Sequence, residues 1–268
     1  MQNFTITHHQ IARSSTTLHY WLAGPTDRPL VVFTHGGRMD HRMFEPQLAD
    51  IARHYRVLLW DMHGCGQSQP MGMDGIFSLR TVVDDLLAIV DQLGYRQASF
   101  VGQSFGAYIS QEIAFLYPER VTALVVIGGF CITMTMPPAL RQGQGGVSNM
   151  SPAQYNQFIA DMVGIRPEVK AYALEASAQV SQETGLATRK ALPGFFHEEV
   201  GYQLSLPFLL THGAYDALDG IIQQAPVWAQ REPNCRYVVI PNAGHAANQD
   251  NPEFFNAILL EFLAQNVA

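Results

Sequence analysis

The chain has 268 residues, of which 47% are hydrophobic, and its 16 basic and 23 acidic residues give a formal net charge of −7. This size suits one sizeable domain, or a core with an insertion, and the net negative charge without Lys/Arg runs argues against a nucleic-acid partner. Three cysteines without a CxxC pair indicate neither a disulfide framework nor a zinc site. No stretch of about 20 apolar residues predicts a membrane span, and the N-terminus has no signal-peptide pattern. We therefore expect a soluble, cytoplasmic protein.

Short apolar runs rich in β-branched residues alternate with longer segments of helical period, which predicts parallel strands joined by crossover helices. The fold class expected is α/β, with a mostly parallel twisted sheet flanked by helices. The predicted strands cover residues 29–34, 55–61, 98–101, 121–127, 207–213 and 236–240, and the predicted helices cover 44–54, 78–93, 105–117 and 252–265.

The segment 131–206 interrupts this alternation. It is rich in Gln, Ala and Met, shows no clear strand, and contains two predicted helices over 151–163 and 167–182. We expect an α/β core formed by residues 1–130 and 207–268, with 131–206 as a helical insertion.

The loop Gly102-Gln103-Ser104-Phe105-Gly106 lies between a predicted strand and a predicted helix. A serine hydroxyl is a poor nucleophile at neutral pH, so it needs a neighbouring base and an exposed position. The G-x-S-x-G pattern in this context matches a nucleophile elbow, whose glycines permit a sharp turn. The alternative is a glycine-containing turn with an idle serine, and the placement between strand and helix favours the elbow.

Five motifs in the same order along nearly the whole chain resemble those of the α/β-hydrolase superfamily. They are His35-Gly36-Gly37, Asp61-Met62-His63-Gly64-Cys65-Gly66-Gln67-Ser68, the Ser104 elbow, the Asp216 loop and Ala243-Gly244-His245. The resemblance implies catalytic residues in the order Ser, acid, His. It assigns Ser104 as nucleophile, His245 as general base and Asp216 as the acid that orients the imidazole, with Asp219 in the same turn as the competing acid.

The resemblance also implies an oxyanion hole made by backbone N–H groups of Phe105 and Gly37, with Gly36 and Arg38 as alternatives to the latter. In this superfamily an insertion at 131–206 is usually a cap over the active site. Residues expected to line the substrate pocket are Arg38, Met134, Phe158, Met162 and Phe195, although apolar residues of a cap often pack the cap itself.

Other polar or reactive residues are given structural roles. His35 and His212 end strands and are expected to make structural hydrogen bonds, and Cys65 to be a packed thiol. Asp40 and His41 are expected to form a satisfied loop pair rather than a substrate contact. We expect no metal and no cofactor.

Serine at the elbow, in place of aspartate, argues against the haloalkane dehalogenases and epoxide hydrolases of the superfamily. The expected reaction is hydrolysis of a carboxylic ester, lactone or thioester with a small to medium, largely apolar acyl group, through an acyl-serine. Alternatives are C–C bond hydrolysis or cofactor-free haloperoxidase chemistry with the same triad, and a slow-turnover ligand-binding or signalling protein. The expected partner is a small-molecule acyl substrate. The sequence is compatible with both a monomer and a homodimer.

Overall fold

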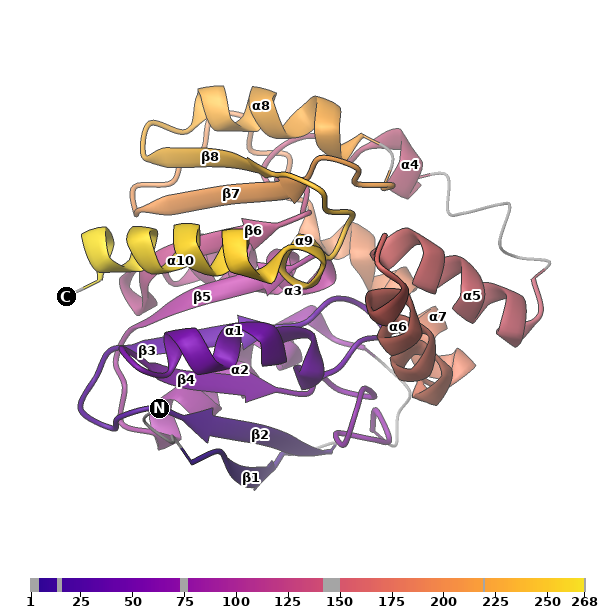
Figure 1. The fold of residues 1–268 in the computed structure, drawn as a ribbon, viewed down its shortest axis with the longest axis horizontal. Helices are drawn as coiled ribbons and strands as arrows, with labels where there is room; N and C mark the ends of the chain where they lie inside the picture. Colours follow the sequence, from indigo (N-terminus) through magenta and orange to yellow (C-terminus); the bar gives the residue numbers. More distant parts are fainter. Residues whose placement is uncertain (1–4, 14–15, 73–76, 142–149, 219, 268) are drawn as a thin grey trace.

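The computed structural model describes residues 5–13, 16–72, 77–141, 150–218 and 220–267. In this part of the chain, eight strands form one sheet in the order β1-β2-β4-β3-β5-β6-β7-β8 (Figure 1). The strands from β4 to β8 in this order are parallel, whereas β1 and β2 pair antiparallel with their neighbours. The strands are β1 (Thr7–Ala12), β2 (Thr17–Ala23), β3 (Leu30–Thr34), β4 (Arg56–Trp60), β5 (Ala98–Gln103), β6 (Val121–Ile127), β7 (Phe208–Gly213) and β8 (Cys235–Ile240).

The six strands expected from the sequence are all present, and the α/β class is confirmed. The hairpin β1–β2 was not predicted. It extends the sheet by antiparallel pairing of β2 with β4, which places Tyr20 opposite Trp60.

Two apolar layers cover the two faces of the sheet. Successive residues of a strand point to opposite faces, so Leu30 and Val32 of β3 belong to one buried cluster and Val31 and Phe33 to the other. The first face is covered by α2 (Leu79–Gln92), α3 (Phe105–Leu116) and α8 (Ile221–Arg231), and the second by α1 (Glu45–Ile51) and α10 (Pro252–Asn266). The short helices η1 (His41–Phe44), η2 (Pro118–Arg120) and α9 (Ala247–Asp250) also belong to the α/β part of the chain, and η2 has no buried residue.

The segment between β6 and β7 contains helices and no strand among its described residues. We call α5 (Pro152–Val163), α6 (Pro167–Gln179) and α7 (Gln182–Ala191) the insertion helices; α4 (Pro138–Arg141) and η3 (Leu192–Phe195) flank them. The insertion helices lie together at one end of the sheet (Figure 1).

The helix expected over 167–182 ends earlier. Ser181 begins a new helix instead, because its hydroxyl accepts the N–H of Thr184 at 3.0 Å and so caps α7. Neither α7 nor α8 was predicted. Within the described residues, no helix has both the length and the apolar character that a membrane crossing requires.

Candidate active site

Ser104 joins β5 to α3 in a backbone conformation that non-glycine residues rarely adopt. Its φ is 50° and its ψ is −114°, and its N–H donates to the carbonyl of Ile127 at 2.9 Å. A Cβ atom at Gly106 would lie 2.1 Å from the carbonyl oxygen of Thr34, so only glycine lets α3 approach β3 this closely. A rare backbone conformation like that of Ser104 typically costs about 1–3 kcal/mol, and such strain is characteristic of functional sites.

His245 and Asp216 form a buried pair. Nδ1 of His245 lies 3.0 Å from each carboxylate oxygen of Asp216, and the two side chains are at most 2% exposed. A carboxylate only accepts hydrogen bonds, so Nδ1 carries a proton, and in the neutral form of the ring Nε2 presents a lone pair. Nε2 is buried and has no hydrogen-bond partner among the described residues. In that form of the ring, Nε2 has the geometry of a proton acceptor.

Two contacts bring the elbow and this pair together. The amide of Gln103, which precedes Ser104, donates to the carbonyl of His245 at 3.1 Å. Ile127, which accepts the Ser104 N–H, precedes Gly128, where an added Cβ would lie 3.0 Å from Nδ1 of His245. The elbow and the His245–Asp216 pair thus meet beside the ends of β5 and β6, although no hydrogen bond joins Ser104 to His245 among the described contacts. Asp219, the competing acid, lies outside the described residues.

The backbone donors expected for an oxyanion are also adjacent. A Cβ at Gly37 would lie 3.5 Å from the Cβ of Phe105, and Phe105 is the first residue of α3, where an N–H has no partner within the helix. Of the alternatives to Gly37, Gly36 is engaged elsewhere, since its N–H points to the sulfur of Met43 at 3.4 Å. This favours Gly37.

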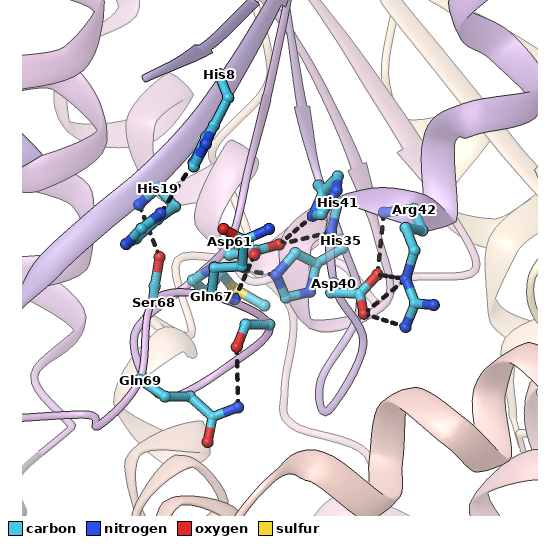
Figure 2. A network of polar contacts seen from close by, with 12 residues as sticks. His8, His19, His35, Asp40, His41, Arg42, Asp61, Gln67, Ser68 and Gln69 are labelled. Carbon is cyan, nitrogen blue, oxygen red and sulfur yellow. Dashed lines mark hydrogen bonds and ion pairs between the residues drawn. The ribbon is translucent and has the colours of Figure 1, made fainter. Parts of the chain in front are cut away.

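We call the segment from Gly36 to Phe44, which includes the short helix η1, the 36–44 loop. The side chain of Asp61 holds it in place. This fully buried carboxylate accepts the backbone N–H of His41 at 2.7 Å, its ring Nδ1 at 2.9 Å and the N–H of Gln67 at 2.7 Å. Figure 2 shows Asp61 between these two segments. The carboxylate therefore joins the 36–44 loop to the loop after β4.

His35 supports the same junction. Its Nε2 accepts the Met62 N–H at 3.0 Å, and its Nδ1 lies 2.8 Å from the carbonyl oxygen of Gly36. Burial lowers the pKa of His35, and the neutral ring with its proton on Nδ1 satisfies both contacts. His212 makes the equivalent contact with Gly213, and its Nε2 lies 2.7 Å from the Tyr237 hydroxyl. Both histidines make the structural contacts expected of them.

The surroundings of Cys65, Asp40 and His41 do not suit a nucleophile or a substrate ligand. Burial raises the pKa of Cys65 to about 12, so its thiol is a poor nucleophile. Asp40 and His41 do not pair with each other as expected: Asp40 binds the Arg42 guanidinium at 2.8 Å, whereas His41 binds Asp61. The side chains of the expected pair are therefore satisfied separately.

The residues expected to line a substrate pocket separate into two groups. Phe195 is fully buried, and its ring centroid lies 5.2 Å from that of Phe105 in an edge-to-face contact. Met134 packs against the same cluster. Phe158 is 37% exposed on α5, and Met162 packs against the cluster on the other face of the sheet. Only the first group lies on the side of Phe105.

Arg38, the remaining pocket residue expected, turns its side chain toward the insertion helices. Its guanidinium bonds Asn156, Ser177 and Val180, so several of its donors are already occupied.

A cleft of about 560 Å³ opens between α1, α6 and the start of α10, with Arg42, Glu45, Tyr172, Glu175 and Pro252 among its lining residues. None of the residues expected in the active site lines it. Two pairs of its charged side chains are in contact, Arg42 with Glu175 at 2.9 Å and Arg166 with Glu168. We therefore do not assign the reaction to this cleft.

The sequence motifs do not identify Gln103 and Gly128 as residues of the site. Gln103 occupies a variable position of the elbow motif, and only the fold shows that its amide holds the His245 loop. Gly128 carried a usable signal, since a glycine directly after a buried strand often marks a close approach of the backbone.

Comparison with known proteins identifies the family of this chain. The family model described as alpha/beta hydrolase fold matches residues 29–252. RutD of Stutzerimonas stutzeri, a proposed carbamate hydrolase, is 27% identical over 261 residues, covering 92% of this chain and 97% of the relative. The 3-oxoadipate enol-lactonase 1 of Acinetobacter baylyi is 24% identical over 256 residues and covers 94% of each chain. The crystal structure of the enol-lactonase from Burkholderia xenovorans superposes with a TM-score of 0.81, at 20% identity over 96% of this chain and 100% of that one. The chain therefore belongs to the α/β-hydrolase fold family.

Proposed function

We propose that the protein is a serine hydrolase that cleaves a carboxylic ester, lactone or thioester through an acyl-serine intermediate on Ser104. The observation that carries this proposal is the pairing of His245 Nδ1 with Asp216, which leaves a buried Nε2 free to accept a proton beside the elbow. The relatives named for enol-lactone and carbamate hydrolysis support cleavage of this kind of acyl bond.

In the proposed reaction, Nε2 of His245 takes the Ser104 hydroxyl proton as Oγ attacks the substrate carbonyl. The carbonyl oxygen becomes an oxyanion, held by the N–H groups of Gly37 and Phe105. The tetrahedral intermediate collapses with cleavage of the bond to the leaving group, which takes the proton from the imidazolium. Water then attacks the acyl-serine, passes a proton to His245 and releases the acid, and the proton returns to Ser104.

A small to medium, largely apolar acyl group fits the surroundings of the oxyanion donors. The ring of Phe105 is flanked by Phe77 and Phe195, with centroid distances of 5.5 and 5.2 Å. Tyr108 lies beside the same rings, 5.7 Å from Phe195. These buried rings make the surroundings of the oxyanion donors apolar, which favours apolar over charged acyl groups. We propose the insertion 131–206 as the cap that covers this site.

The test combines a fluorophosphonate probe with p-nitrophenyl esters of increasing acyl length and an aromatic lactone, with Ser104→Ala as the control. We expect the wild type to be labelled and to turn over the short and medium esters, and Ser104→Ala to lose label and about 10³-fold or more in kcat. Labelling without turnover of any substrate would favour the slow ligand-binding class. Absence of both would refute the proposed reaction.

A further inference from the structure

Arg38 directly follows Gly37 in the 36–44 loop, and its side chain reaches the insertion helices. Its Nε donates to the Ser177 hydroxyl at 2.9 Å. Its Nη2 donates to the Asn156 side chain at 3.1 Å and to the carbonyls of Ser177 and Val180 at 2.8 and 3.0 Å. One side chain of the core therefore contacts α5, α6 and the turn before α7.

The charge of Arg38 suits this position. The carbonyls of Ser177 and Val180 lie at the C-terminal end of α6, where the helix dipole favours a cation. The guanidinium also lies over the Tyr155 ring, with Cζ 5.3 Å from the ring centroid. A Cβ at Gly185 would lie 2.3 Å from Nη1, so the insertion fits closely around the group.

The backbone of Arg38 is equally constrained. Its φ of 64° is a left-handed value that arginine seldom adopts, and the conformation is held from both sides. On the side of the sheet, the 36–44 loop is bound to Asp61. On the side of the insertion helices, it is bound to α6, where the Tyr172 hydroxyl donates to the carbonyl of Asp40 at 3.1 Å. A shift of the insertion helices would therefore be transmitted to the peptide unit next to Gly37.

We infer that Arg38 is a positioning residue that couples the proposed cap to the oxyanion donor at Gly37. This inference rests on the proposed function. The cap would then do more than enclose the substrate: with Arg38 seated at the end of α6, the Gly37 N–H is held in its active orientation, and when the cap moves away the donor is lost.

The first experiment compares Arg38→Ala and Arg38→Lys with Arg189→Ala, using p-nitrophenyl acetate and butyrate. Arg189 is the matched control because its Cζ lies 5.4 Å from the same Tyr155 ring, while among the described residues its Nε bonds only Gly185 within α7. Rates are normalised to active sites titrated to completion with the fluorophosphonate.

We expect kcat of Arg38→Ala to fall about 10- to 100-fold, somewhat less than the 10²- to 10³-fold that removal of an oxyanion donor costs. KM should stay within about threefold of the wild-type value, since the acyl contacts remain. Arg38→Lys should recover only part of the rate, because a lysine cannot reproduce the planar fork. Millimolar guanidinium should partly restore Arg38→Ala, and Arg189→Ala should match the wild type.

The second experiment removes the partners on the insertion side, which also covers the case in which Arg38→Ala does not fold. Asn156→Ala and Ser177→Ala should each lower kcat severalfold at unchanged KM. Combined with Arg38→Ala, where that variant folds, they should add little further loss, because residues acting through one contact are not additive.

Three results would overturn the inference. One is a kcat per active site within twofold of the wild type for Arg38→Ala, or for both partner variants. Another is a defect confined to KM that grows with acyl length, which would return Arg38 to the substrate-binding role expected from the sequence. The third is a wild type without Ser104-dependent turnover, in which case the proposed function itself fails; an active wild type with an equally active Arg38→Ala refutes only the coupling.

Discussion

A side chain at Gly128 would place its first carbon 3.0 Å from Nδ1 of His245 and 3.1 Å from a carboxylate oxygen of Asp216. The end of β6 thus forms one wall of the slot that holds the pair. Because Gly128 has a φ of 59°, it combines a steric requirement with a conformational one. These two requirements can be separated experimentally.

Gly128→Ala should lower both stability and kcat, whereas Gly94→Ala should lower stability alone. Gly94 has a φ of 79°, but a Cβ there would meet no atom within 4 Å. Each variant should lose about 1–2 kcal/mol in urea unfolding from the left-handed backbone. Only Gly128→Ala should also lose about 100-fold in kcat, because the imidazole is displaced from its working geometry. Equal kcat values for the two variants would show that the slot tolerates the methyl group.

Asp216→Asn tests whether the acid sets the histidine tautomer. An asparagine amide can donate to Nδ1, which favours the ring with its proton on Nε2 and so blocks acceptance of the Ser104 proton. We expect kcat to fall by about 10⁴-fold with little change in KM. Asp219→Asn is the control and should retain activity within about threefold of the wild type. Full activity in Asp216→Asn would transfer the role of the acid to Asp219.

The elements that the sequence predicted well are those whose burial leaves a compositional signal. The parallel strands are buried on both faces and appear as continuous apolar runs, as in Leu30–Thr34. Strand β1 is exposed along nearly its whole length, so its residues Thr7–Ala12 carry no comparable pattern. Helix α8 buries only Ile221, Ala225 and Trp228 and contains Pro226, which obscures its period.

The same distinction applies to the site. The positions of Ser104 and His245 follow from motifs local in sequence, and Asp216 from its distance after a strand. The preference for Gly37 over Gly36 depends on where the Met43 sulfur lies, and the contacts of Arg38 depend on residues more than 100 positions away. Neither the preference for Gly37 nor the contacts of Arg38 can be predicted from a short sequence motif. Phe158 and Phe195 are both aromatic residues of the insertion, and only packing shows that Phe195 faces Phe105.

Phe195→Ala should both destabilise the protein and change its substrate preference. The buried ring contacts those of Phe105 and Tyr108, so truncation should cost about 3–5 kcal/mol in urea unfolding. The space created beside the oxyanion donors should raise kcat/KM for hexanoate and octanoate esters relative to acetate. Phe158→Ala, at a residue 37% exposed, should change stability by about 0.5 kcal/mol or less and leave the preference unaltered. The opposite pattern would place the acyl pocket beside α5.

The contacts of the buried Asp85 carboxylate predict how the free energy of unfolding changes at low pH. Its oxygens bind His63 at 2.9 Å and Arg13 at 2.5 Å. Burial alone would raise the pKa of Asp85, but these two hydrogen bonds outweigh it and hold the pKa below its ordinary value. A carboxyl with a depressed pKa in the folded state contributes stability that is present above its unfolded value, about pH 3.9, and is lost as the pH falls through the folded pKa.

The unfolding free energy of the wild type, measured in urea from pH 7 to pH 3, should therefore fall more steeply below about pH 4 than that of Asp85→Asn. The variant should be less stable than the wild type at pH 7, because the Arg13 guanidinium and His63 lose their charged partner. Asp84→Asn, which removes an exposed carboxylate from the same helix, is the control and should follow the wild-type profile, since exposed ion pairs contribute little. Parallel profiles for the wild type and Asp85→Asn below pH 4 would show that the acid sensitivity arises from other carboxylates.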